Sequence, residues 1–228
     1  MSRQATGIGV PRPPLEGVGV RILVAGASGR TGQLFTRLAL SRGHTVTALV
    51  RTSSRFRLEH ANLRVVHADV LAPETLAPAL AEQDVVVSLL APRPRINGRV
   101  YVEGTRNLAD AAVAAGVTRM VVVSASGAGI EPDALPLAYR IVLRIPVVAR
   151  LYPDIAQMER DVAARTDLDW TIIRAAILTS GPRTGNYRTT LGDTVPGGLR
   201  ISRADLAEFL LGVVEAGAYR RQRVALAR

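Results

Sequence analysis

The sequence predicts an α/β fold of the Rossmann type, a doubly wound parallel sheet with helices on both faces, formed by a single domain. Three observations predict it. Short apolar runs rich in Val, Ile and Leu alternate with helical patterns along the chain. The first of these runs, 22–25, is apolar throughout and has branched side chains, which is typical of a strand buried on both faces of a parallel sheet. A glycine-rich turn joins the first run to the first helical segment.

The first half of the chain carries the regular alternation. Residues 1–19 are rich in glycine and proline and are expected to form a flexible lead-in, so the domain spans 20–228. The expected strands are 22–25, 45–50, 63–68, 84–90 and 118–123, and the expected helices between them are 33–42, 73–83 and 99–115. Because parallel strands are joined by right-handed crossovers, the expected strand order is 3-2-1-4-5-6.

The second half is less regular. A helix is expected at 155–165, the sixth strand at 170–174, and a helix over 203–216 that Ser202 caps, with Asp205 in its first turn. The segment 130–151 is expected to pack against the domain. The segment 181–198 is expected to be a loop that covers a site, and 223–227 a last strand at the edge of the sheet. For 130–151, a lid, a dimer surface or a surface-seeking segment are the alternatives.

Composition excludes several classes of protein. The 228 residues include no Cys and no Lys, and all 29 basic residues are Arg, with a net charge of +10. Disulfides, thiol catalysis and catalytic lysines are therefore excluded. The arginines are scattered and aromatic residues make up 4%, so a solvated basic surface is favoured over nucleic-acid binding.

Location and partners follow from similar arguments. No uncharged apolar run reaches about 18 residues, so no membrane span is expected, and a cytoplasmic monomer or homodimer is predicted. The three histidines lack the spacing of metal ligands, so no metal is expected.

The glycine turn is the first candidate binding site. Glycines at three-residue intervals separate the first strand from the first helix, an order that binds the diphosphate of a dinucleotide at the helix N-terminus. The spacing is G-x-x-G-x-x-G, which differs from the general G-x-G-x-x-G fingerprint. The predicted diphosphate-binding residues are Gly26, Ala27, Ser28, Gly29, Arg30, Thr31 and Gly32.

The end of the second strand predicts which dinucleotide is bound. NAD-binding proteins usually carry an acidic residue there, whereas this chain carries Arg51, followed by Ser54 and Arg55. A guanidinium forms charge-assisted hydrogen bonds with the 2′-phosphate of NADP(H), which a carboxylate would repel. NADP(H) is therefore the expected cofactor.

Further contacts are expected where the later strands end, because ligands bind at the carboxyl edge of such a sheet. Asp69 and Val70 follow the third strand and are placed at the adenine. Leu90 and Ala91 follow the fourth and are placed near the nicotinamide ribose. Ser124 and Ser126 follow the fifth, near the nicotinamide, and are candidates for orienting it or the acceptor.

Six short motifs, in order over roughly residues 20–227, resemble those of atypical short-chain dehydrogenases/reductases. The resemblance is to the NAD(P)H-binding group that includes NmrA-like proteins and biliverdin IXβ/flavin reductases. It implies a Rossmann-type fold, NADP(H), and a reductase acting on a small planar or carbonyl-bearing acceptor. The matching motifs are Gly26-Ala-Ser-Gly29-Arg-Thr-Gly32, Leu49-Val-Arg51-Thr-Ser-Ser-Arg55, Asp69-Val-Leu, Glu103-Gly-Thr-Arg-Asn107, Leu168-Asp-Trp-Thr-Ile-Ile-Arg174 and Ile201-Ser-Arg-Ala-Asp-Leu-Ala207.

The chain departs from the family at the expected proton donors. Without Lys, the Tyr-x-x-x-Lys motif is impossible, and neither Tyr139 nor Tyr152 begins one. The helix histidine of the flavin reductase branch aligns with Ile155, and the active-site serine of that branch aligns with Ala125. Two hypotheses follow: an NADPH-dependent reductase of a flavin, quinone or related carbonyl compound, or a non-catalytic NADP(H)-binding redox sensor of the NmrA-like type.

Overall fold

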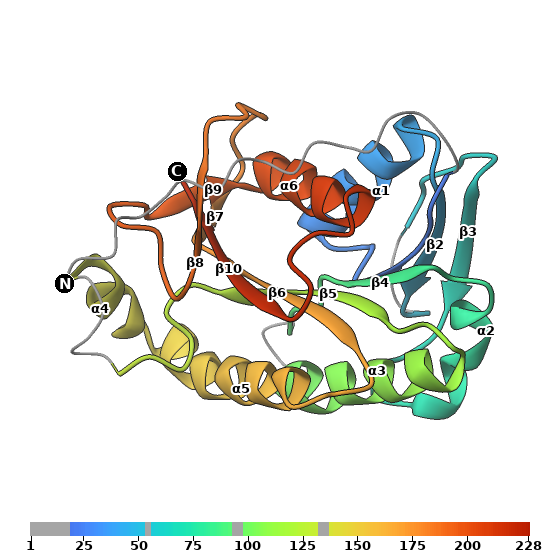
Figure 1. Cartoon of the computed structure of the whole chain (residues 1–228), viewed down its shortest axis with the longest axis horizontal. Helices are drawn as coiled ribbons and strands as arrows, with labels where there is room; N and C mark the ends of the chain where they lie inside the picture. The colour runs from blue at the N-terminus through green and yellow to red at the C-terminus, as the bar shows by residue number, and fades with distance from the viewer. Residues whose placement is uncertain (1–18, 53–55, 93–97, 132–136) are drawn as a thin grey trace.

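The computed structural model describes residues 19–52, 56–92, 98–131 and 137–228. Its main feature is an eight-stranded sheet in the order β3-β2-β1-β4-β5-β6-β10-β8 (Figure 1). A separate two-stranded sheet pairs β7 with β9 in parallel. The strands are β1 (Arg21–Ala25), β2 (Thr45–Val50), β3 (Leu63–His67), β4 (Val85–Ser88), β5 (Arg119–Ala125), β6 (Asp169–Ala175), β7 (Ile177–Thr179), β8 (Arg188–Leu191), β9 (Arg200–Ser202) and β10 (Gln222–Ala227).

The first six strands confirm the predicted order 3-2-1-4-5-6, and all are parallel to their neighbours. Two predictions about the second half were wrong. The strand expected at an edge is β10, which lies inside the sheet, parallel to β6 and antiparallel to β8. The segment 181–198 is not loop throughout, because β8 lies within it and closes this side of the sheet. The interior place of β10 explains why Val224 to Ala227 are fully buried.

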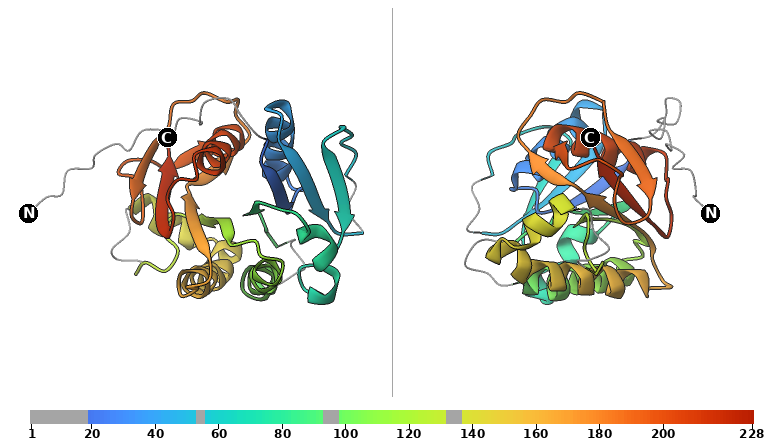
Figure 2. Two further views of the ribbon diagram at one scale, coloured as in Figure 1. Left: turned by 45° about the vertical axis from the view of Figure 1, so that its right-hand side comes forward. Right: turned by 90° about the vertical axis from the view of Figure 1, so that its left-hand side faces the viewer.

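Two layers of helices cover the sheet. On one face α1 and α6 pack side by side, and on the other α3 and α5 lie next to each other (Figures 1 and 2). Each face has its own apolar core, with Phe35 and Phe209 buried in the first and Met158 and Trp170 in the second. The helices are α1 (Arg30–Ser41), α2 (Ala77–Leu80), α3 (Thr105–Ala114), α4 (Leu137–Leu143), α5 (Pro146–Ala163) and α6 (Arg203–Glu215).

Three predicted helices differ from the observed ones in type or by more than three residues, and α1 begins three residues before the expected 33. The helix expected over 73–83 consists of a 3₁₀ turn, η1 (Pro73–Thr75), followed by α2. The helix expected over 99–115 begins as a π-helical segment, η2 (Val100–Gly104), and continues as α3. The helix expected over 155–165 begins earlier, at Pro146.

The segment 130–151 forms α4 and the first turns of α5 where it is described. It is packed in part, since Tyr139 is buried whereas Leu137 and Ile141 are exposed. In the described ranges, no helix combines the length and apolarity that a membrane crossing requires.

Candidate functional site

The glycine turn between β1 and α1 has a shape that only glycine tolerates at two positions. Gly26 has φ +84°, and a Cβ there would lie 2.5 Å from the backbone oxygen of Leu89, which directly follows β4. At Gly32 a Cβ would lie 2.2 Å from the Gly26 oxygen. The turn is closed by a hydrogen bond from the Gly29 N–H to the same Gly26 oxygen, at 2.9 Å. Strand, turn and helix are thereby held in close contact.

The N-terminus of α1 is suited to an anion. Its N-cap is Gly29, no side chain caps it, and its first turn contains no acidic residue. The N–H groups of the first turn and the positive end of the helix dipole therefore face outward with no carboxylate to compete for them. These observations fit a diphosphate group at this point.

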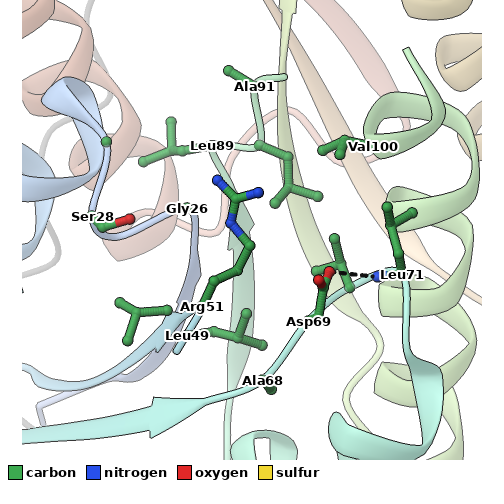
Figure 3. A pocket seen from close by; sticks show the side chains of 14 residues that line it. Gly26, Ser28, Leu49, Arg51, Ala68, Asp69, Leu71, Leu89, Ala91 and Val100 are labelled. Atoms are coloured by element: carbon green, nitrogen blue, oxygen red, sulfur yellow. Dashed lines mark hydrogen bonds between the residues drawn. The ribbon is translucent and has the colours of Figure 1, made fainter. Parts of the chain in front are cut away.

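A pocket of about 220 Å³ opens beside this turn, at the carboxyl ends of β1 to β4. It is called the glycine-turn pocket here. Its walls come from the turn itself, from the segments that follow β2 and β3, and from Leu89 to Ala91 after β4 (Figure 3). Four strands thus contribute to one cavity through the residues that follow them.

Arg51 and Asp69 are the charged side chains of this pocket. The Arg51 side chain extends between the glycine turn and Asp69 (Figure 3). The Asp69 carboxylate accepts a hydrogen bond from the Leu71 N–H at 3.0 Å, and the Asp69 N–H donates to the Thr75 hydroxyl at 3.1 Å. These bonds fix the turn after β3, and the second Asp69 oxygen has no hydrogen-bond partner among the described residues.

A second pocket, of about 320 Å³, adjoins the first and shares Leu89, Leu90 and Ala91 with it. It is called the tyrosine pocket here, because Tyr101, Tyr139 and Tyr152 contribute to its wall. It lies over the ends of β4, β5 and β6, and the rest of its lining is mainly aliphatic. No charged side chain is among the described residues that line it.

Two of the three tyrosines are held by backbone carbonyls. The Tyr152 hydroxyl donates to the Ser126 oxygen at 3.0 Å, and the Tyr139 hydroxyl donates to the Gly198 oxygen at 3.1 Å. Burial, with the nearby Tyr139 and Tyr101 side chains, raises the pKa of Tyr152 to about 12. Burial also raises the pKa of Tyr101 above its ordinary value. All three hydroxyls therefore stay protonated at neutral pH.

Ser124 connects the tyrosine pocket to a buried ion pair. Its hydroxyl donates to Glu159, whose carboxylate also accepts from the Arg174 guanidinium at 2.5 and 3.0 Å. Glu159 is 2% exposed and Arg174 is 6% exposed. Burial alone would lower the pKa of Arg174, but the hydrogen bonds and charges of Glu159 and Asp193 together outweigh burial and raise that pKa. Because the Ser124 proton points at Glu159, the serine presents only lone pairs to the pocket.

The structure brings most of the sequence-predicted residues together. The glycine-turn pocket is lined by Gly26, Ser28, Gly29, Arg51, Asp69, Val70, Leu90 and Ala91. Thr31 and Ser124 line the tyrosine pocket. Ala27 and Gly32 are buried, Arg30 is exposed, and none of these three lines either pocket. Ser54 and Arg55 lie outside the described residues.

The two predicted serines differ in position. Ser126 is 1% exposed and lines neither pocket, and its hydroxyl donates to the Arg174 oxygen within the sheet at 2.9 Å. Ser124 is the one that faces a cavity. Sequence reasoning did not predict Tyr101, Glu159 and Arg174 as parts of this region. Arg174 ends one of the family motifs, which assigns it no site role, and nothing in the local patterns of Tyr101 and Glu159 distinguishes them from ordinary helix residues.

The family comparison agrees with this geometry. A family model described as NAD(P)H-binding matches residues 26–216. The 3-diazoavenalumate denitrifying reductase of Streptomyces is 35% identical over 193 residues, which cover 74% of this chain and 59% of that protein. Photosystem II assembly factor Ycf39 of Synechocystis is 30% identical over 161 residues, which cover 69% of this chain and 44% of that protein. The chain thus spans about half the length of these two relatives.

Solved structures share the fold over nearly the whole domain. A Burkholderia pseudomallei protein is 31% identical, with a TM-score of 0.73 over 92% of this chain and all of that chain. A short-chain dehydrogenase/reductase of Veillonella parvula in complex with NADP has 17% identity and a TM-score of 0.77. The match covers 92% of this chain and 95% of that chain. ChuY, an anaerobilin reductase of Escherichia coli O157:H7, has 21% identity and a TM-score of 0.73. The match covers 91% of this chain and 97% of that chain. The last two likenesses establish the fold alone.

Proposed function

The chain belongs to the NAD(P)H-binding family, and on that premise we propose that it is an NADPH-dependent oxidoreductase that reduces a small planar acceptor. The acceptor classes are a flavin, a quinone or a related carbonyl compound. One observation carries the proposal. The tyrosine pocket adjoins the glycine-turn pocket along Leu89, Leu90 and Ala91, so that a ring in one pocket lies next to a dinucleotide end placed in the other.

The cofactor-binding roles follow from position. The glycine turn and the uncapped start of α1 hold the diphosphate, and Arg51 pairs with the 2′-phosphate. Asp69 and Val70 lie at the adenine, and Leu90 and Ala91 lie near the nicotinamide ribose. Ser124 orients the nicotinamide or the acceptor by accepting a hydrogen bond from an N–H group, because its own proton is given to Glu159.

The acceptor class follows from the walls of the tyrosine pocket. Its described lining residues carry no charge and are mainly aromatic and aliphatic. Such walls bind a neutral, flat ring by apolar contact and stacking, and they exclude water from it. When bound, NADPH supplies a hydride, and the main contribution of the chain to such a transfer is to position the two rings.

The alternative is a non-catalytic NADP(H)-binding sensor that acts through a partner protein. It is favoured by the absence of Lys and by the apolar Ile155 on the pocket wall where the flavin reductase branch carries histidine. The two curated relatives include both a protein named as a reductase and one named as an assembly factor. Acceptor-dependent oxidation of NADPH distinguishes the reductase from the sensor, because only the reductase turns the cofactor over.

The test is steady-state oxidation of NADPH, followed by absorbance, with menadione, riboflavin and FMN as acceptors. We expect acceptor-dependent oxidation that saturates with at least one of them. Tight NADPH binding without turnover across this panel would contradict the reductase and support the sensor.

A variant of the acceptor site provides the control. Ile177 lines the tyrosine pocket and is 42% exposed, so a tryptophan there narrows the pocket without overpacking the core. Ile177→Trp should raise KM for the acceptor while leaving the Kd for NADPH within about twofold. A loss of NADPH binding in this variant would show that the tyrosine pocket also takes part in binding NADPH.

A further inference from the structure

Tyr101 has an unusual position in the chain. It belongs to η2, the π-helical segment at the start of α3, and its side chain contributes to the wall of the tyrosine pocket. A π-helical turn adds one residue to the helical repeat and so redirects the side chains within it, and such turns are common at functional sites. The turn is tightly packed: at Gly104 a Cβ would lie 2.8 Å from Val70, and at Gly98 it would collide with Asp154.

The hydroxyl of Tyr101 also differs from those of its neighbours. The hydroxyls of Tyr139 and Tyr152 donate to backbone carbonyls and are thereby committed to the fold. Among the described residues, no hydrogen-bond partner is found for the Tyr101 hydroxyl. Tyr101 is a half-buried residue of the wall of this largely apolar cavity, and a hydroxyl with no partner among the described residues is available to a ligand.

We propose that Tyr101 is the proton donor to the acceptor, a proposal that rests on the proposed reductase function. Hydride transfer delivers two electrons and one hydrogen nucleus to the acceptor, and the acceptor oxygen or nitrogen that gains the negative charge must then take one proton. The Tyr101 O–H bond breaks and supplies that proton. The phenolate left behind takes a proton from water, which restores the hydroxyl and completes the balance.

Other donors on the pocket wall are less suited to this role. Ser124 gives its proton to Glu159, and Thr31 belongs to the turn at the proposed diphosphate site. His44 lies away from both pockets and bonds to Glu215. Burial raises the pKa of Tyr101, so its hydroxyl carries a proton throughout the neutral pH range.

The experiment compares full-length Tyr101→Phe with the wild type, and uses Tyr187→Phe as the matched control. Tyr187 packs on Phe209 and lines neither pocket, so its hydroxyl serves no proposed step. In Tyr101→Phe, kcat with menadione should fall about 100-fold or more, because general acid catalysis contributes 10²–10⁴-fold. The Kd for NADPH should stay within about twofold, which also shows that the variant is folded. Tyr187→Phe should match the wild type in both.

Tyr101→His makes the test specific for proton donation. Imidazole has a pKa of about 6.5, so this variant should regain part of the activity and lose it as the pH rises above that value. The wild type should keep its rate through neutral pH. A Tyr101→Phe variant with kcat within twofold of the wild type would overturn the proposal and leave the reductase standing. A wild type with no turnover on any acceptor would overturn both.

Discussion

Arg51 is the residue on which the choice between NADPH and NADH depends. It stands between the glycine turn and Asp69 in the glycine-turn pocket, where an acidic residue would favour NADH. Hydrogen bonds to a charged group contribute roughly 1.5–3 kcal/mol. Arg51→Gln should therefore raise the Kd for NADPH by about tenfold or more and change the Kd for NADH by less than twofold. Fluorescence titration with each nucleotide measures both constants.

A control for this prediction is available on the neighbouring strand. Arg64 is an exposed residue of β3 outside both pockets. Arg64→Gln changes the net charge equally and should leave both constants unchanged. If Arg51→Gln weakened NADPH and NADH to the same extent, the 2′-phosphate would not be its partner.

At the residue scale, the sequence could predict what depends on local pattern. Gly26, Arg51 and Asp69 were identifiable because each stands at a fixed offset from the end of a strand. Tyr101 was not, because a π-helical start has the same apolar periodicity as an ordinary helix. Glu159 and Arg174 could not be identified from the sequence either, since their ion pair joins a helix to a strand and depends on the packing between the two elements.

The element that best illustrates helix capping is α6. Ser202 accepts a hydrogen bond from the Asp205 N–H at 2.9 Å, as predicted. The buried Asp205 carboxylate also accepts from Thr184 and Gly185, which ties the preceding loop to the helix. Burial alone would raise the pKa of Asp205, but the hydrogen bonds from Thr184, Gly185 and Ser202 outweigh it and hold the pKa below its ordinary value.

This depressed pKa predicts how stability depends on pH. A carboxyl whose folded pKa is lower than its unfolded pKa stabilises the fold above the unfolded value, and loses that effect as the pH falls through the folded value. Asp205→Asn places an amide N–H₂ where an acceptor is needed by Ser202 and Thr184. The variant should be less stable by about 1–3 kcal/mol at pH 7. The difference should shrink toward pH 3, as measured by urea unfolding.

The matched control is Asp110→Asn, which removes an exposed carboxylate from α3. It should change the free energy of unfolding by less than about 1 kcal/mol. A stability difference for Asp205→Asn that was constant from pH 7 to pH 3 would show that ionisation of Asp205 does not matter.

Element boundaries show a second limit of sequence reasoning. The six parallel strands were predictable because each contains a short group of branched apolar residues between helical or turn patterns. The four residues of β8 were not predictable as a strand, because the sequence Arg-Thr-Thr-Leu is mostly polar and the surrounding loop is rich in glycine and proline. The run of β10 was recognised as a strand, but its place between β6 and β8 depends on pairing that no local pattern encodes.

At the scale of the whole molecule, Glu159 joins separate parts of the fold. From α5 it binds Ser124 on β5 and Arg174 on β6, and the Arg223 guanidinium on β10 lies 3.5 Å from its carboxylate. Glu159→Gln leaves the buried Arg174 without its full counter-charge. Removing one partner of a buried ion pair costs about 3–5 kcal/mol. We expect the free energy of unfolding, measured with urea, to fall by this amount, and the Tm to fall with it.

Two further variants test the explanation. Glu74→Gln removes an exposed carboxylate from η1 and should be nearly neutral. The double variant Glu159→Leu with Arg174→Met removes both charges of this pair and should recover part of the lost stability, because an apolar pair of similar volume has no desolvation penalty. The recovery is partial because Arg223 and Asp193 each lose a charged neighbour. A Glu159→Gln variant within about 1 kcal/mol of the wild type would contradict the role of this ion pair.

The position of β10 also imposes an order on biosynthesis. The ribosome releases β8 before β10, the strand with which it pairs, and roughly thirty residues separate the two. At about 5–20 residues per second, β8 waits about 2–6 s for its partner. During this interval β6 also has an open edge, to which another nascent chain can add. The growing polypeptide therefore still carries an open sheet edge late in translation, when most of the sheet has already been made.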